Sequence, residues 1–184
     1  MNVIRSFLRT LGETPHVYVV LLLAAVVSAL AAPLAARRTG LGWLPAGLLL
    51  FSFGAVLAIT LTPGIGGDPS APITCQGLVP APSLSELWSL TNENGQNVLL
   101  FVPLGLFIGL IPRRNVLLGA AVGAAALPFA IEGIQALLPG FARSCQAWDV
   151  VENVLGLAIG LVIGSLLAGL VRVADQPEAG TDRP

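Results

Sequence analysis

Several carboxylate and amide side chains lie near the ends of long apolar stretches, at spacings that place them on one face of a helix. Glu132 and Gln135 are three residues apart, which puts them about 60° apart around a helix axis. Asp149, Glu152 and Asn153, at the start of the next apolar stretch, span an arc of about 100°. Burying an ionisable group among apolar residues is costly. The spacing therefore predicts polar contacts between neighbouring helices.

Two further polar residues belong with this group. Arg143 lies in the turn between the two stretches, and Asn97 opens another apolar stretch. The forked guanidinium group suits phosphate or carboxylate, and a desolvated acid such as Glu132 can act as a general acid or base. We expect these seven side chains to converge at one membrane surface: Asn97, Glu132, Gln135, Arg143, Asp149, Glu152 and Asn153. Alternatively, Glu132 or Asp149 pairs with Arg143, and the amides only join helices.

The composition indicates which solvent the chain uses. Of the 184 residues, 55% are hydrophobic and 10% are charged, and the mean hydropathy is +0.85. Soluble domains carry about 25% charged residues, so these charges are too few to cover a globule in water. The same numbers exclude a disordered chain. With a net charge of −1, the chain has no basic surface for a nucleic acid partner.

Five apolar stretches are long enough, or nearly so, to cross a bilayer, which takes about 20 residues. The predicted spans are His16–Ala36, Trp43–Leu61, Val98–Ile111, Asn115–Leu138 and Asp149–Val173. We therefore expect an all-α, polytopic transmembrane helical bundle of about five spans, forming a single domain over residues 1–174. Residues 175–184 are rich in charge and proline, which predicts a disordered cytoplasmic tail.

The arginines predict the orientation, since basic residues favour the cytoplasmic side. A five-span bundle places three groups of arginines on one side: Arg37 with Arg38, Arg113 with Arg114, and Arg172 with Arg183. The loops over residues 62–96 and 139–148 then lie outside, and the C-terminus is cytoplasmic.

The N-terminus fits this rule poorly, because Arg5 and Arg9 would lie outside. In one alternative, residues 1–11 form an interfacial helix. In another, the first span is a signal peptide with a cleavage site at Ala29-Leu30-Ala31. Cleavage there would place Arg37 and Arg38 outside, which opposes the arginine rule.

The long outer loop contains the sequence Ser83-Leu84-Ser85-Glu86, which fits a capping box. Leu84, Leu87 and Trp88 follow at helical spacing, and Asn92–Gly95 would end the run. We expect a short helix on the outer membrane surface, with Trp88 as its interfacial anchor. The alternative is an ordinary loop turn.

Cys75 and Cys145 both fall in predicted outer loops. The medium outside a bacterial membrane permits disulfides, and this bond would close a loop of about 70 residues. The alternatives are two unpaired buried thiols or two reactive thiols. The single histidine, His16, is remote in sequence, so no metal site and no other cofactor is predicted.

A stripe of glycines continues the polar face of the last span, at Gly156, Gly160 and Gly164. Small residues at four-residue spacing let a neighbouring helix approach closely. The stripe therefore predicts that this face points to the interior of the bundle.

Three motifs, in order and spacing, carry a family resemblance. They are Asn97-Val98-Leu99-Leu100-Phe101-Val102-Pro103-Leu104-Gly105, Glu132-Gly133-Ile134-Gln135, and Arg143 followed by Asp149, Asn153 and Gly156. Over about residues 62–170 the chain resembles the VanZ family of bacterial membrane proteins, named for a member associated with teicoplanin resistance. Gln146 departs from the family pattern, in which a second acid is expected three residues after the arginine. That weakens any role for two carboxylates in this turn unless Glu152 substitutes.

The resemblance implies a multi-pass protein of the bacterial plasma membrane with a role in glycopeptide tolerance. The leading hypothesis is that the polar site binds or modifies an anionic envelope lipid, a cell-wall precursor, a lipoglycan or a lipoglycopeptide antibiotic, with Arg143 on the anionic group. A second hypothesis is an outer-leaflet enzyme with Glu132 as acid or base beside Asp149, where Arg143 and Asn153 stabilise developing charge. A third is an assembly partner whose polar cluster only locks helices. Membrane lipid is the predicted partner, and the sequence sets no oligomeric state.

Overall fold

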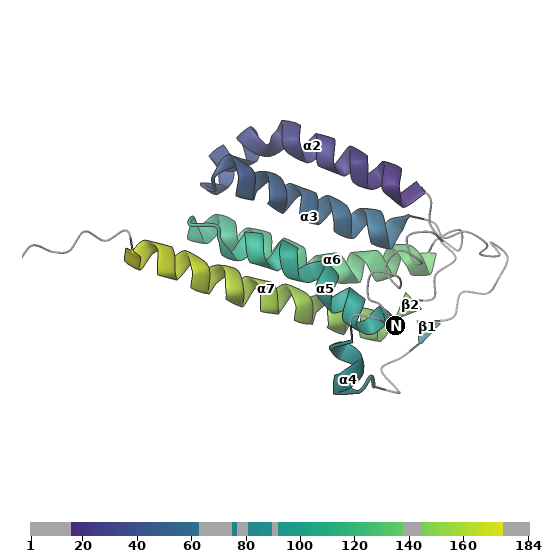
Figure 1. Cartoon of the computed structure of the whole chain (residues 1–184). Coiled ribbons are helices and arrows are strands. Elements are labelled where there is room, and N and C mark those ends of the chain that lie inside the picture. The colour runs from purple at the N-terminus through teal and green to yellow at the C-terminus, as the bar shows by residue number, and fades with distance from the viewer. Residues whose placement is uncertain (1–15, 63–74, 77–80, 90–91, 138–144, 175–184) are drawn as a thin grey trace, which may run out of the picture.

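The computed structural model describes residues 16–62, 75–76, 81–89, 92–137 and 145–174 of the chain. Helices dominate the described part, and the only strands in it are two residues long (Figure 1). The elements are α2 (His16–Thr39), α3 (Trp43–Leu61), β1 (Cys75–Gln76), α4 (Leu84–Leu87), α5 (Glu93–Gly109), α6 (Arg114–Leu137), β2 (Cys145–Gln146) and α7 (Ala147–Ala174). The alternative interfacial helix over residues 1–11, Arg143 and the predicted disordered tail fall outside these residues. The alternative cleavage site at Ala29-Leu30-Ala31 lies within α2 and stays a prediction.

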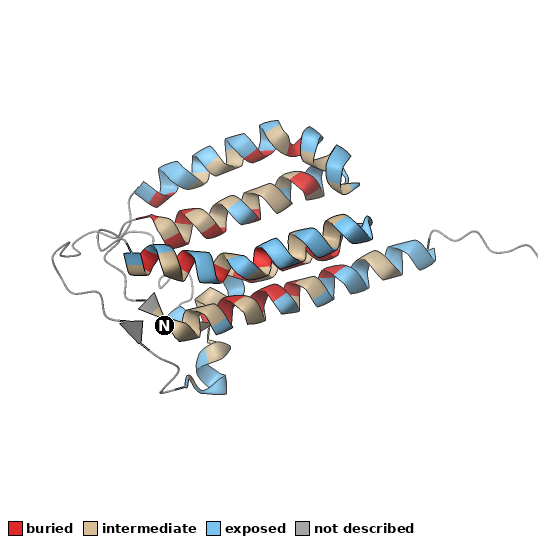
Figure 2. Cartoon of the chain, turned by 180° about the vertical axis from the view of Figure 1, so that it is seen from behind, coloured by how far each residue is buried: buried red, intermediate tan, exposed pale blue. Residues whose placement is uncertain are grey.

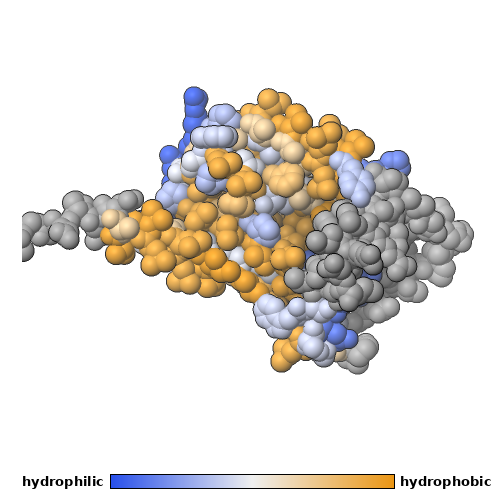
Figure 3. All heavy atoms as spheres, in the orientation of Figure 1, coloured by the Kyte–Doolittle hydropathy of each residue, from blue (hydrophilic) through white to orange (hydrophobic). Residues whose placement is uncertain are grey.

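Four helices are long and apolar enough to cross a bilayer, namely α2, α3, α6 and α7. Helix α5 has 17 residues, including Pro103, and is shorter than each of these. Large apolar side chains remain exposed on the outside of the bundle, as the orange surface of Figure 3 shows. Leu30, for example, is 78% exposed. An apolar exterior of this extent suits lipid rather than water, and the protein is therefore a multi-pass membrane protein.

The helices form two groups (Figure 1). Helices α2 and α3 pack against each other as a hairpin, and α5 packs along α7, with α6 beside both. The core between them includes Val56, Phe101, Ile131 and Leu157. Figure 2 shows that buried residues line the sides of the helices that face one another.

Backbone contact between α5 and α7 explains the glycines of both helices. A Cβ added to Gly156 would collide with the Val98 carbonyl oxygen, and one added to Gly160 would collide with that of Val102. A step forward along α7 from Gly156 to Gly160 moves the contact forward along α5 from Val98 to Val102. The two helices therefore run parallel. Small residues permit this approach. Packing at this distance fixes the rotation of α7, and so the direction in which its polar residues point.

The start of α5 differs from the sequence prediction. Asn92–Gly95 was expected to end a short outer helix, and instead the Asn92 side chain caps α5 by accepting from the Gly95 amide at 3.1 Å. Helix α5 therefore begins at Glu93, five residues before the predicted apolar span at Val98. A Cβ on Gly95 would collide with the Ser89 carbonyl oxygen. The first turn of α5 therefore packs closely against Ser89, a contact that hydropathy alone does not reveal.

The predicted capping box is present at the start of α4. The Ser83 side chain accepts from the Glu86 backbone amide, and the Glu86 carboxylate accepts from the Ser83 amide at 2.6 Å. The Ser83 hydroxyl also donates to the Glu86 carboxylate at 2.8 Å. The bonds from the Ser83 amide and hydroxyl to this carboxylate lower the pKa of Glu86 below its usual value. Leu84 and Trp88 lie on α4 with their side chains exposed.

The two short strands bring distant parts of the chain together. Strand β1 pairs with β2 in parallel, and Cys75 and Cys145 are Cα partners in this register. The pairing joins the long segment after α3 to the turn before α7. The side chains of both cysteines lie outside the described part of the structure, so the disulfide stays a prediction.

The arginines that the structure describes lie at the end of the bundle away from β1 and β2. Arg37 and Arg38 lie in the last turn of α2, Arg114 begins α6, and Arg172 lies in the last turn of α7. The Arg113 guanidinium donates to the carbonyls of Arg37 and Arg38 at 3.1 and 2.9 Å. This contact joins the last turn of α2 to the turn before α6 and holds Arg113 beside Arg37 and Arg38.

Candidate functional site

Asn97 connects α5 to α7 at the end of the bundle away from the arginines. Its amide nitrogen donates to Asp149 Oδ1 at 3.0 Å and to Glu152 Oε2 at 3.1 Å. Each bond has a carboxylate acceptor, and hydrogen bonds to charged groups are about twice as strong as neutral ones. One side chain of α5 thus holds two acids of α7.

Two oxygens at this junction have no hydrogen-bond partner among the residues that the structure describes. Glu152 is 1% exposed and Asn153 is 3% exposed, and no described group donates to Glu152 Oε1 or to Asn153 Oδ1. Buried polar atoms are usually paired, so an unpaired one calls for a specific explanation. Both atoms are hydrogen-bond acceptors, and what they lack is a donor.

Glu132 lies on α6 and faces the turn that precedes α7. Its Oε2 accepts from the Gln146 backbone amide at 2.9 Å. The side chain is half-buried, whereas Pro128, one turn earlier, is fully buried. A single backbone donor therefore ties α6 to β2, the strand that leads into the acids of α7.

Gln135 bonds away from this junction. Its amide nitrogen donates to the Thr60 carbonyl oxygen of α3 at 2.9 Å, and the residue is 4% exposed. The last carbonyls of a helix have no partner within it, and α3 ends at Leu61. Gln135 thus satisfies the end of α3 and fastens α6 to it, which is a structural contact.

The described structure brings together four of the seven predicted residues. Asn97 bonds Asp149 and Glu152, and Asn153 follows Glu152 on α7. Glu132 approaches from α6 through Gln146, Gln135 is directed to α3, and Arg143 lies outside the described residues. Sequence reasoning missed the contributions of Thr60 and Gln146, because both act through backbone atoms. The position of Thr60 at the end of an apolar stretch could have indicated its role, because the last carbonyls of a helix have no partner within the helix.

The charges of this junction are negative. Glu132, Asp149 and Glu152 contribute three carboxylates. Every arginine that the structure describes lies at the end of the bundle away from this junction. Among the described residues no group of three or more metal-ligating side chains is placed to hold a metal ion. The arrangement can accept hydrogen bonds from hydroxyl, amide or ammonium groups.

Comparison with known proteins agrees with this picture of a multi-pass helical bundle. Neither a curated protein nor a solved structure matches the chain. A family model described as VanZ/LLP1 matches residues 16–168. This match runs from the first residue of α2 into α7 and includes every residue of the polar junction. The protein therefore belongs to the VanZ/LLP1 family.

Proposed function

We propose that the protein binds an amphipathic envelope ligand at its polar junction, on the outer side of the bacterial plasma membrane. The ligands that fit are an anionic envelope lipid, a cell-wall precursor, a lipoglycan or a lipoglycopeptide antibiotic such as teicoplanin. All of these combine an apolar chain with a head group that carries negative charge and hydrogen-bond donors.

The unpartnered oxygens of Glu152 and Asn153 carry this proposal. A buried acceptor without a donor costs about 1–3 kcal/mol, and both oxygens lack a donor among the described residues. Sugar hydroxyls and amide groups are donors of the required kind. A ligand that supplied them would recover this cost on binding.

Arg143 supplies the complementary half of the site. It lies three residues before Gln146, whose backbone amide donates to Glu132, so chain connectivity keeps its Cα within about 11 Å of the Gln146 Cα. Its guanidinium would bind the phosphate or carboxylate of the ligand. The acceptor oxygens on α7 would then bind the hydroxyl or amide donors of a head group, and the Arg143 guanidinium would bind its phosphate or carboxylate.

The proposed orientation follows the arginines. We count α5 as a fifth span, because it lies parallel to α7 and leads to the turn that holds Arg113 and Arg114. Basic residues favour the cytoplasmic side, so the polar junction and the exposed Leu84 and Trp88 of α4 face outside. There α4 would lie in the interface, and a Cys75–Cys145 disulfide would hold β1 against β2.

Native mass spectrometry of the full-length protein in detergent tests the proposal. The probes are undecaprenyl phosphate, a lipid-linked muropeptide, phosphatidylglycerol and teicoplanin, with phosphatidylcholine as the zwitterionic comparison. We expect at least one anionic probe to be retained in preference to phosphatidylcholine. Glu152→Gln and Asn153→Ala should each weaken its binding about tenfold, the worth of one such hydrogen bond.

Arg143→Ala should abolish retention, whereas Arg172→Ala removes an arginine at the other end of α7 and should leave it unchanged. Thermal unfolding of each variant is measured in the same detergent. Binding that falls only in proportion to thermal stability would show a structural cluster and overturn the proposal. Equal retention of all four probes and phosphatidylcholine by the unaltered protein would also overturn it.

A further inference from the structure

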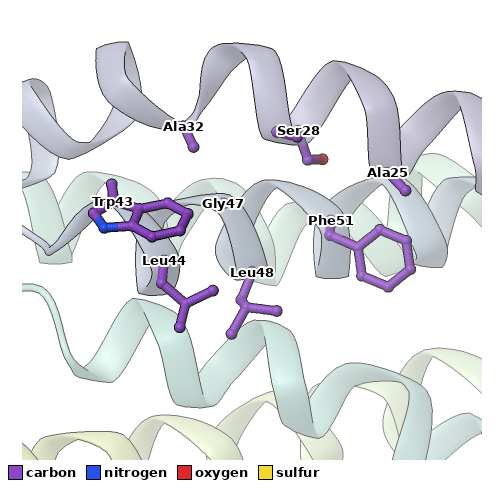
Figure 4. A pocket seen from close by; sticks show the side chains of 9 residues that line it. Ala25, Ser28, Ala32, Trp43, Leu44, Gly47, Leu48 and Phe51 are labelled. Carbon is purple, nitrogen blue, oxygen red and sulfur yellow. The ribbon is translucent and has the colours of Figure 1, made fainter.

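A groove of about 290 Å³ lies between α2 and α3, in the half of this hairpin nearer the arginines. Its floor consists of small residues, and the aromatic rings of Trp43 and Phe51 stand at its two ends (Figure 4). These two residues are eight positions apart on α3, which is about 12 Å along the helix. The groove is therefore long, narrow and open on the lipid-facing surface.

The sequence of both helices produces this shape. Helix α2 contributes Ala25, Ser28, Ala29 and Ala32 at spacings of three and four residues, which form one stripe. Helix α3 contributes Gly47, where an added Cβ would lie 3.3 Å from the Ala32 Cβ. Because the backbones approach closely beneath small side chains, the hairpin leaves a channel that no side chain in the described part of the protein fills.

Positive charge surrounds one end of the groove. Arg37 and Arg38 follow Ala32 in the last turns of α2, and both are exposed. Helix α3 begins at Trp43 without a side-chain cap, so its positive helix end is available to an anion. Arg113 is held against the same turn by its bonds to the backbone. Basic pockets between membrane helices bind anionic head groups.

We propose that this groove is a second binding site, which takes an acyl chain of an anionic glycerophospholipid whose phosphate lies among Arg37, Arg38 and the start of α3. The occupant follows from the two ends of the site: an apolar channel that opens to lipid, and a cationic rim at the membrane surface. The site is independent of the ligand proposed for the polar junction, because it lies on different helices near the opposite surface.

Fluorescence quenching by brominated lipids tests the inference, because Trp43 lines the groove. The full chain with Trp88→Phe and Trp148→Phe keeps Trp43 as its single tryptophan. It is reconstituted in phosphatidylcholine vesicles that contain a fixed fraction of dibrominated phosphatidylglycerol or dibrominated phosphatidylcholine. We expect brominated phosphatidylglycerol to quench Trp43 more strongly than its fraction in the vesicle predicts.

Arg37→Gln and Arg38→Gln should each lower the preference for phosphatidylglycerol about fivefold, the usual effect of one arginine near an anionic surface. Arg172→Gln removes the same charge from the end of another helix and is the matched control. Ala29→Leu fills the groove from an exposed position and should reduce quenching, whereas Ala126→Leu on the exposed face of α6 should not.

Three results would overturn the inference. The first is equal quenching by the two brominated lipids. The second is an effect of Arg172→Gln as large as that of Arg37→Gln, which would reduce the preference to general surface charge. The third is the shielding of Trp43 from both lipids, which would show that a second chain covers the groove.

Discussion

Asn97 holds together the acids of α7, since it donates to Asp149 and Glu152 from another helix. Helical spacing predicted that these residues share a junction, because the angle between two positions on a helix is fixed. Spacing did not predict that Gln135 bonds α3, since its acceptor is the Thr60 carbonyl, a backbone atom of a helix distant in sequence. Side-chain patterns thus revealed the junction, but not the backbone partners at its edge.

Substitution of Asn97 by alanine should lower the stability of the protein. Both acids would lose a donor in a part-buried position, and bonds to charged groups contribute about 1.5–3 kcal/mol each. We expect a loss of about 3 kcal/mol in the free energy of unfolding, measured in detergent, which is the lower bound for the two bonds together because both are only part-buried. Asn115→Ala, at an exposed position of α6, is the control. An unchanged unfolding energy for Asn97→Ala would show that water replaces its amide.

The capping box of α4 should depend on pH. Because the pKa of Glu86 is lowered by bonds from Ser83, the charged form stabilises α4. A lowered pKa gives stability that is present above the unfolded value of 4.5 and is lost as the pH falls through the folded value. Hydrogen exchange of the Ser83 amide should therefore accelerate as the pH is lowered below 4.5, after correction for the intrinsic rate. Glu86→Gln should remove this extra acceleration.

At the scale of elements, hydropathy predicted the bounds of the four longest helices closely and the start of α5 poorly. The bounds of α3, Trp43–Leu61, match the prediction, because apolar residues fill the whole helix. Helix α5 begins at Glu93, because its first turns are polar and are ordered by the Asn92 cap and by contact with α7. Tertiary contacts of this kind leave little signal in an apolar profile.

The parallel packing of α5 on α7 predicts that Gly160→Ala destabilises the bundle. The new Cβ would meet the Val102 carbonyl oxygen and the Leu106 amide nitrogen, which are backbone atoms and cannot move aside cheaply. Overpacking costs about 1–3 kcal/mol. Gly169→Ala on the same helix meets nothing within 4 Å and should be neutral or stabilising. Thermal unfolding in detergent compares the two variants. Equal unfolding midpoints for Gly160→Ala and Gly169→Ala would contradict the described packing.

At the scale of the whole molecule, charge divides the bundle into two ends. The described arginines are at one end, and the acids of α6 and the start of α7 are at the other. The sequence predicted this division from the arginine positions and the five predicted spans between them. The pairing of β1 with β2 was less accessible, because two-residue strands far apart in sequence carry no periodic signal.

The register of β1 and β2 predicts a disulfide that stabilises the whole fold. Cys75 and Cys145 are Cα partners on adjacent strands. Paired positions on adjacent strands have a Cα–Cα distance that a disulfide can bridge. Closing a loop of about 70 residues would stabilise the protein by about 4 kcal/mol in the chain-entropy model. Reductant should therefore lower the thermal midpoint of the unaltered protein and leave that of the Cys75→Ser/Cys145→Ser double variant unchanged.

Mass spectrometry after alkylation identifies the bond directly. Protein isolated without reductant should take up no alkylating group, and one fragment should join Cys75 to Cys145 after proteolysis. Because the outside of a bacterial membrane permits disulfides and the cytoplasm opposes them, the same result supports the proposed orientation of the polar junction. Alkylation of both thiols in the absence of reductant would refute the bond, leaving backbone pairing and the Glu132–Gln146 contact to hold β2 in place.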